Sequence, residues 1–238
     1  MLEIRDLTIQ YEGQPPVLEH FNLSMKKGEI ISIAGESGSG KTTVIRAILG
    51  ALAGGGKITE GEILFLGESL TEKSPKEWRT LRGTKISMIF QDCGGTLNPI
   101  RKIGSQYVEY ICTHSRASKQ EAWNRAVHML KKMHLPDGEA VMKSYPHQLS
   151  GGMRQRVGIA MAMTFQPRLL LADEPTGNLD PKNSLDIMKL LEEINERGTT
   201  VVIVTHNREI VNSFKKRVIT MRKGVIVSDE QEGEYLEN

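Results

Sequence analysis

Apolar side chains form three near-continuous runs of strand length along this chain. The runs lie at residues 29–34, 168–173 and 199–205, and polar or glycine-rich residues follow each of them. Apolar runs without the alternation of a half-exposed strand are typical of strands that helices cover on both faces. The pattern therefore predicts a parallel sheet within an α/β fold.

A helical pattern between the second and third runs supports this prediction. Pro181 suits the first turn of a helix, and the residues from there to Arg197 carry apolar side chains three or four positions apart. We expect this helix to bury one stripe, formed by Leu185, Met188, Leu191 and Ile194.

Antiparallel hairpins are predicted near both ends of the chain. Short apolar stretches within residues 2–25 flank a turn-like segment at 12–16 that contains glycine and proline. Residues 218–227 have the same character around Lys223-Gly224. The remaining short elements are a strand at 62–66, a helix at 76–81 and a strand at 85–90 that runs into Gln91.

A helical insert is predicted in the middle of the chain. Residues 103–133 have charged side chains among apolar positions and few β-branched pairs, and Pro136-Asp137-Gly138 ends the pattern. We expect a helical subdomain at residues 92–150. It would interrupt a core formed by residues 1–91 and 151–238, which also holds the antiparallel strands.

Composition bounds the kind of protein. With 238 residues, 39% of them hydrophobic, the chain can bury a large core without disulfides, and the spacing of Cys93 and Cys112 fits neither a zinc site nor a redox pair. There is no apolar signal region and no run of about 18 apolar residues, so we expect a cytoplasmic protein that meets a membrane only through a partner. The net charge of +2 is too small to indicate a nucleic-acid surface.

Two local features suggest no specific partner or chemistry. Nothing near Cys93 in the sequence would activate its thiol, so we do not expect a redox role for it. The acidic residues at the end of the chain are expected to form a frayed terminus. They are Asp229, Glu230, Glu232, Glu234 and Glu237.

A glycine-rich loop lies between the first apolar run and a helical pattern at residues 43–49. Glycines let the backbone approach an anion closely, so that several N–H groups point at one phosphate at a helix N-terminus. Lys41 would reach the β- and γ-phosphates of a nucleoside triphosphate, and the Thr42 hydroxyl would bind Mg²⁺. This predicted phosphate loop consists of Gly35, Glu36, Ser37, Gly38, Ser39, Gly40, Lys41, Thr42 and Thr43.

Two carboxylates, Asp173 and Glu174, come at the end of the second apolar run. In open parallel sheets the carboxyl ends of strands face the ligand crevice, so both side chains are expected near the phosphates. Asp173 would hold Mg²⁺ through water. Glu174 would act as the general base that polarises the attacking water.

Three further residues follow predicted strands. His206 comes after the third apolar run, where it can hydrogen-bond the γ-phosphate and orient the water. The neutral amide of Gln91 can contact Mg²⁺ or the water and release it easily, which suggests a sensor that links the nucleotide to the helical insert. Tyr11 closes a short strand, where its ring can stack on adenine.

The order of these motifs resembles the ATP-binding subunits of ABC transporters across essentially the whole chain. The most specific element is the signature segment, Leu149-Ser150-Gly151-Gly152-Met153-Arg154-Gln155. In that family the signature starts a helix and binds the γ-phosphate held by the opposite subunit, as expected for the anion site at a helix N-terminus. The resemblance implies that Ser150, Gly151, Gly152 and Gln155 bind a nucleotide across a dimer interface and that Asp180 helps to couple the two sites.

This resemblance also implies the cofactors, partners and location. ATP and Mg²⁺ would bind, and a second ATPase subunit, identical or homologous, would complete each site. ATP hydrolysis would drive membrane permease subunits, with an extracellular solute-binding protein taking part indirectly. The expected fold is a P-loop ATPase core with a parallel sheet, an antiparallel β subdomain and an inserted α-helical subdomain, placed at the cytoplasmic face of the membrane.

Finer motifs suggest a subfamily. Thr96-Leu97-Asn98-Pro99 and residues 144–148 resemble the dipeptide, oligopeptide and nickel importer ATPases. The length of the chain is closer to that of the nickel or metallophore members than to that of the longer oligopeptide members. We therefore expect a role in the uptake of a peptide, nickel or a metal chelate.

Other functions stay open at this point. Thr176-Gly177-Asn178 resembles lipoprotein-releasing and macrolide-export ATPases, so an ABC ATPase of a lipoprotein-release or export system is one alternative. A soluble nucleic-acid-associated ABC ATPase is another, although such proteins usually carry a long coiled-coil insertion or two ATPase halves. A stand-alone phosphotransferase would have no use for the signature segment.

Overall fold

A six-stranded, mostly parallel sheet forms the centre of the computed structural model, which describes residues 1–233. Its strands follow the order β10-β9-β3-β8-β7-β6, and only β10 runs antiparallel to its neighbour. Every residue of β3, β7 and β8 is buried, which explains the three apolar runs. The strands are β3 (Ile30–Gly35), β6 (Ile86–Ile89), β7 (Leu169–Asp173), β8 (Thr200–Thr205), β9 (Arg217–Arg222) and β10 (Val225–Glu230).

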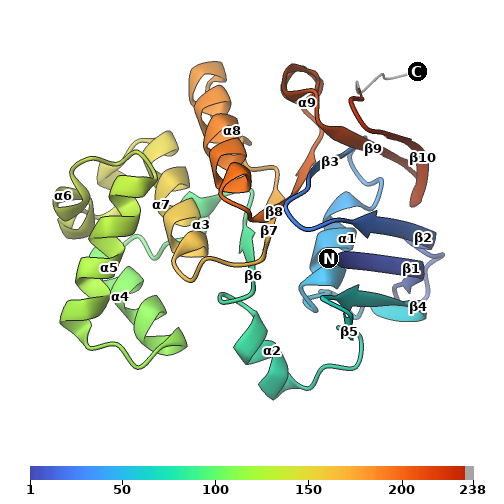
Figure 1. Cartoon of the computed structure of the whole chain (residues 1–238), viewed down its shortest axis with the longest axis horizontal. Helices are drawn as coiled ribbons and strands as arrows, with labels where there is room; N and C mark the ends of the chain where they lie inside the picture. Colours follow the sequence, from blue (N-terminus) through green and yellow to red (C-terminus); the bar gives the residue numbers. More distant parts are fainter. Residues whose placement is uncertain (234–238) are drawn as a thin grey trace.

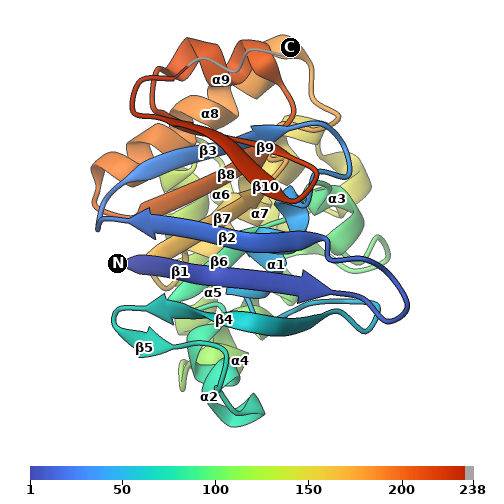
Figure 2. The same ribbon diagram turned by 90° about the vertical axis from the view of Figure 1, so that its right-hand side faces the viewer.

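A second sheet is antiparallel and lies on one side of the first (Figures 1 and 2). Its order is β2-β1-β4-β5. Both predicted hairpins are confirmed: β1 pairs with β2 in this sheet, and β9 pairs with β10 in the large sheet, each antiparallel. The strands are β1 (Leu2–Gln10), β2 (Leu18–Met25), β4 (Lys57–Phe65) and β5 (Glu68–Ser69). Helix α1 (Lys41–Ile48) shares a buried apolar cluster with both sheets and so joins them.

Helices gather on the opposite side of the large sheet, as the left half of Figure 1 shows. The stretch predicted as one helical region at 103–133 is divided into α4 and α5, because Ser118 starts a new helix with a capping box that includes Glu121. The helices of this group are α3 (Cys93–Thr96), α4 (Ile103–His114), α5 (Lys119–Lys132), α6 (Gly138–Lys143), a 3₁₀ turn (Pro146–Gln148) and α7 (Gly151–Met163). The others are α2 (Pro75–Leu81), α8 (Pro181–Glu196) and α9 (Arg208–Phe214).

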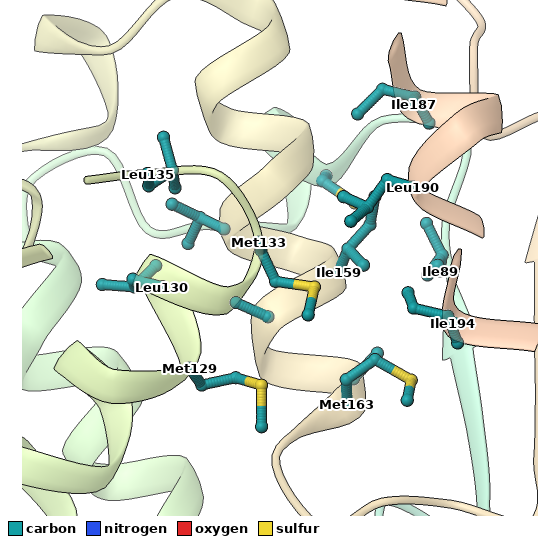
Figure 3. Close-up of a cluster of buried hydrophobic side chains, with 14 of the residues drawn as sticks. Ile89, Met129, Leu130, Met133, Leu135, Ile159, Met163, Ile187, Leu190 and Ile194 are labelled. Carbon is teal, nitrogen blue, oxygen red and sulfur yellow. The ribbon is translucent and has the colours of Figure 1, made fainter. Parts of the chain in front are cut away.

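One apolar cluster connects this helical group with the large sheet and α8 (Figure 3). Side chains of α5, α7, α8 and β6 meet there, and Met129, Met133 and Met163 contribute thioethers. The cluster continues across the boundaries proposed from the sequence at residues 92 and 150, so the insert is packed against the core and does not stand apart from it.

Two expectations change with the structure. Leu185 was expected on the buried stripe of α8 but is 43% exposed, whereas Leu190 is fully buried. Asp229 and Glu230 belong to β10, and Arg217 holds Asp229 with two hydrogen bonds of 2.7 Å, so these two residues are not part of a frayed terminus. Glu234 and Glu237 lie outside the described residues.

The structure bears on the reactivity of Cys93 and on whether any helix is long and apolar enough to cross a membrane. Burial raises the pKa of the Cys93 thiol to about 12, which disfavours the reactive thiolate. Among the described residues, the helices are all too short or too polar to cross a membrane.

The packing of α8 leads to a prediction about the free energy of unfolding. Leu190→Ala should lower the free energy of unfolding by about 2–5 kcal/mol, because it removes buried methyl groups and leaves a cavity. Leu185→Ala, on the same helix but exposed, is the matched control and should change it by less than about 1 kcal/mol. Urea denaturation followed by circular dichroism would measure both, and equal effects would contradict the assignment of the buried face.

Candidate nucleotide site

Four neighbouring parallel strands end at one edge of the large sheet and deliver most of the predicted residues there. Gly35 ends β3, Asp173 ends β7, His206 follows β8 and Gln91 lies two residues after β6. An open cleft of about 620 Å³ lies at this edge. It is lined by every phosphate-loop residue except Ser39, together with Gln91, Glu174, His206 and Val17.

The phosphate loop requires glycine at two points at least. Gly40 caps α1 with a φ of 97°, and a Cβ there would lie 2.7 Å from Leu18 Cδ2. A Cβ on Gly35 would lie 2.3 Å from the carbonyl oxygen of Met221. The Gly35 contact is with rigid backbone, and the φ of Gly40 is strained for any residue with a side chain, so these glycines let the loop pack against β2 and β9.

Lys41 occupies the centre of the loop. Its Nζ donates hydrogen bonds to the carbonyl oxygens of Gly35 at 2.7 Å and Glu36 at 2.6 Å. Burial lowers the pKa of Lys41, and the charges of Glu174 and Asp173 oppose that shift. A buried ammonium held by neutral carbonyls has strong affinity for an anion, because little water competes with the anion.

The Thr42 hydroxyl donates a hydrogen bond of 3.0 Å to Oδ1 of Asp173 and thereby joins the loop to the end of β7. Burial raises the pKa of Asp173, although the bond from Thr42 and the charges of Arg46 and Lys41 act against this. Hydroxyl, carboxylate and amide oxygens bind Mg²⁺ directly or through its bound waters. Thr42, Asp173 and Gln91 therefore form a set that fits this ion.

Glu174 begins a tight turn after β7. Its backbone has a φ of 46°, a left-handed conformation that is uncommon for a residue with a side chain. The N–H of Glu174 donates to Val204 O at 2.8 Å, and His206 Nδ1 lies 2.7 Å from Glu174 Oε1. The Glu174 carboxylate is largely buried while the His206 side chain is 67% exposed, so the pair places a carboxylate in the cleft beside an exposed imidazole.

The signature segment lies outside this cleft. Ser150 is exposed and caps α7, accepting a hydrogen bond of 3.2 Å from the N–H of Met153. Asp180 caps α8 and accepts one of 3.0 Å from the N–H of Asn183. Within one chain, Ser150, Gly151 and Gly152 are thus absent from the lining of the cleft that holds Lys41.

Two residues predicted to contact nucleotide have other partners in the structure. Gln155 is buried, and its amide Nε2 donates to Pro175 O at 2.7 Å. The Tyr11 ring packs against Gly56, where a Cβ would lie 2.8 Å from Tyr11 Cε1, and Tyr11 is not among the residues that line the cleft. Val17 lines it instead, and no pattern in the sequence distinguishes this valine.

The site and fold together define a class of protein, a P-loop ATPase cassette whose signature segment lies apart from its own phosphate loop. Comparison with known proteins agrees with this class. Residues 18–177 match the family model described as ABC transporter. This chain therefore belongs to the ABC transporter family, which confirms the predicted family.

Individual relatives refine the comparison. The chain is 38% identical to the dipeptide transport ATP-binding protein DppD of Lactococcus lactis over 95% of its length and 66% of that protein. It is 40% identical to the oligopeptide transport ATP-binding protein OppD of Bacillus subtilis over 95% of its length and 65% of that protein. The chain thus spans just under two thirds of the length of these two relatives.

A solved structure matches along the whole fold. The ATP-binding cassette MJ0796, in a dimeric post-hydrolysis state bound to ADP and Pi, superposes with a TM-score of 0.84 at 33% identity. The match covers 99% of this chain and 100% of that one.

Proposed function

We propose that this chain binds ATP and Mg²⁺ in the cleft at the ends of β3, β6, β7 and β8, and hydrolyses ATP as one of a pair of cassettes that power peptide import. The observation that carries the proposal is the convergence of Lys41, Thr42 and Glu174 on one cleft, with Asp173 hydrogen-bonded to Thr42. A phosphate-binding cation, a set of Mg²⁺ ligands and a base are the groups that phosphoryl transfer to water requires.

Each group has a distinct role in this proposal. Lys41 exchanges its two carbonyl partners for phosphate oxygens and so holds the triphosphate. Thr42, Asp173 and Gln91 would hold Mg²⁺, which supplies positive charge opposite the phosphates when bound. Glu174 orients the attacking water and takes its proton, while His206 keeps the carboxylate in place through their 2.7 Å contact.

A second cassette completes the site. Ser150, which caps α7, is exposed, and a helix N-terminus attracts anions. We infer that they cap the γ-phosphate bound to a partner subunit, identical or homologous, so that two ATP molecules lie between two cassettes.

Transport is inferred from the relatives. Their names assign them to dipeptide and oligopeptide transport, which favours peptides over nickel, metal chelates or an export substrate. Membrane permease subunits would then hold this chain at the cytoplasmic face, and a solute-binding protein would deliver the peptide.

Reconstitution with the permeases tests this function. The cassette and peptide permeases, placed in proteoliposomes with a solute-binding protein, should hydrolyse ATP faster when a peptide is added. Stimulation by a nickel chelate and not by peptides would contradict the proposed substrate class, and absence of any ATP hydrolysis would contradict the proposed activity.

Ser150→Ala tests the shared site. It should weaken ATP-driven dimerisation of a hydrolysis-blocked cassette at least tenfold, as measured by light scattering, because the γ-phosphate loses a hydroxyl donor. The change also removes a helix cap worth about 0.5–2 kcal/mol. Ser118→Ala, which removes the equivalent cap from α5, is therefore the control and should leave dimerisation unchanged. Normal dimerisation of the Ser150 variant would rule out the shared contact.

A further inference from the structure

Gln155 connects the signature helix to the turn that carries Glu174. It lies in the second turn of α7, five residues after Ser150, and is only 5% exposed. Its Nε2 donates a buried hydrogen bond of 2.7 Å to the carbonyl oxygen of Pro175, the residue directly after Glu174. This bond joins α7 to the peptide that bears the proposed base.

The Glu174 turn is held from several sides. The N–H of Glu174 is bonded to Val204 O of β8 at 2.8 Å, and the N–H of Gly177 closes the turn on Glu174 O at 2.9 Å. A left-handed conformation costs a residue with a side chain about 1–2 kcal/mol, and it persists where surrounding bonds determine it. The bond from Gln155 comes from outside both the turn and the sheet.

The start of α7 also packs against the chain that follows this turn. A Cβ on Gly151 would lie 3.3 Å from Leu179 Cδ2, and one on Gly152 would lie 2.5 Å from Asn183 Oδ1. Together with the bond from Gln155 to Pro175, three points of contact tie the first two turns of α7 to residues 175–183. Signature and base therefore belong to one packed unit, although they would serve different ATP molecules.

We propose that Gln155 is a positioning residue that fixes the Glu174 turn to the signature helix α7. When α7 closes on the ATP bound by the partner subunit, this link positions the Glu174 carboxylate at the ATP bound by its own chain. The inference rests on the proposed function, in which signature and base act at opposite sites. Gln155 itself does not line the cleft that holds Lys41. Its effect is expected in the rate of hydrolysis and in the coupling between the two sites, and not in the affinity for ATP.

Two variants remove the bond in different ways. Gln155→Leu fills a similar volume without a donor, and Gln155→Glu keeps the shape but presents oxygen to the Pro175 carbonyl. Both should lower kcat at least tenfold, since small displacements of a catalytic group cost that much or more. The ATP dissociation constant, measured with a fluorescent ATP analogue, should stay within twofold of wild type. The Hill coefficient for hydrolysis should fall toward one.

Asn195→Leu is the matched control for stability. The Asn195 amide also donates to backbone carbonyls, Gly28 O at 2.9 Å and Thr199 O at 2.8 Å, but it lies at the far end of α8 from Asp180. It should lower the melting temperature while kcat and the Hill coefficient stay at wild-type values.

The outcomes separate this inference from the proposed function. If the wild-type cassette fails to hydrolyse ATP, the proposed function fails. If it hydrolyses ATP and both Gln155 variants do so at the same rate and with the same Hill coefficient, only the positioning role is overturned. A loss of ATP affinity in the Gln155 variants would instead show a nucleotide contact, and an equal loss of kcat in Asn195→Leu would show a general effect of stability. Either result would also overturn the positioning role.

Discussion

Glu174→Gln is expected to lower the rate of ATP hydrolysis by about 10²–10⁴-fold while leaving ATP binding intact. The amide keeps the shape of the side chain and an oxygen that can still accept from His206, but it cannot take a proton from water. Stopped turnover with ATP bound should also keep two cassettes closed. Release of labelled phosphate measures the rate, and size-exclusion chromatography with ATP measures the closed dimer.

The control for this variant is Glu192→Gln. Glu192 pairs with Lys216 at 2.7 Å on the surface of α8 and lies outside the cleft, so its replacement should leave hydrolysis unchanged. Hydrolysis by Glu174→Gln at more than a tenth of the wild-type rate would show that another group acts as the base.

Lys41→Ala is expected to weaken ATP binding by roughly 10- to 150-fold. A hydrogen bond to a charged group contributes about 1.5–3 kcal/mol, and Lys41 presents a buried ammonium at the centre of the phosphate loop. The loss should be much larger for ATP than for adenosine, because adenosine has no phosphate for Lys41 to hold. Isothermal titration calorimetry with both ligands measures this difference.

Lys216→Ala provides the control, because it also removes one positive charge, but at the surface beside Glu192. It should leave the affinity for ATP unchanged. An equal loss of affinity for ATP and adenosine in Lys41→Ala would indicate that the loop has collapsed and that no specific phosphate contact was removed.

Much of the fold could be predicted from local patterns. The runs at β3, β7 and β8 are continuous because both faces of these strands are buried, and the hairpin at Lys223-Gly224 has both residues at positive φ, as a tight hairpin turn requires. The site residues at the strand ends followed from the rule that the carboxyl ends of parallel strands meet at one edge. The boundaries of the helical subdomain stay a prediction, since one apolar cluster runs across them.

Other features could not be predicted because they depend on distant neighbours. At about 100° per residue, a spacing of three drifts around a helix, and Leu185 lies about 120° from Leu191 on α8. How far the covered face extends depends on what packs against it, and Leu185 lies beyond its edge. The Gln155 amide lies near a nucleotide-binding motif in the sequence. Only the approach of Pro175 to α7 shows that this amide donates a hydrogen bond to a backbone carbonyl of the same chain. The Val17 side chain lines the cleft because β2 starts beside Gly40, and a valine in the sequence carries no such signal.

The sequence by itself determined the chemistry of the phosphate loop, the strand-end acids and the signature, because glycine, lysine and carboxylate at those spacings have few other uses. It also determined which segments become buried strands. The tertiary structure alone decided which residues share a cleft, that the signature lies apart from the phosphate loop, and that Gln155 bonds to the turn that carries Glu174. Those relations depend on contacts between segments far apart in the chain, and local residue patterns contain no information about such distances.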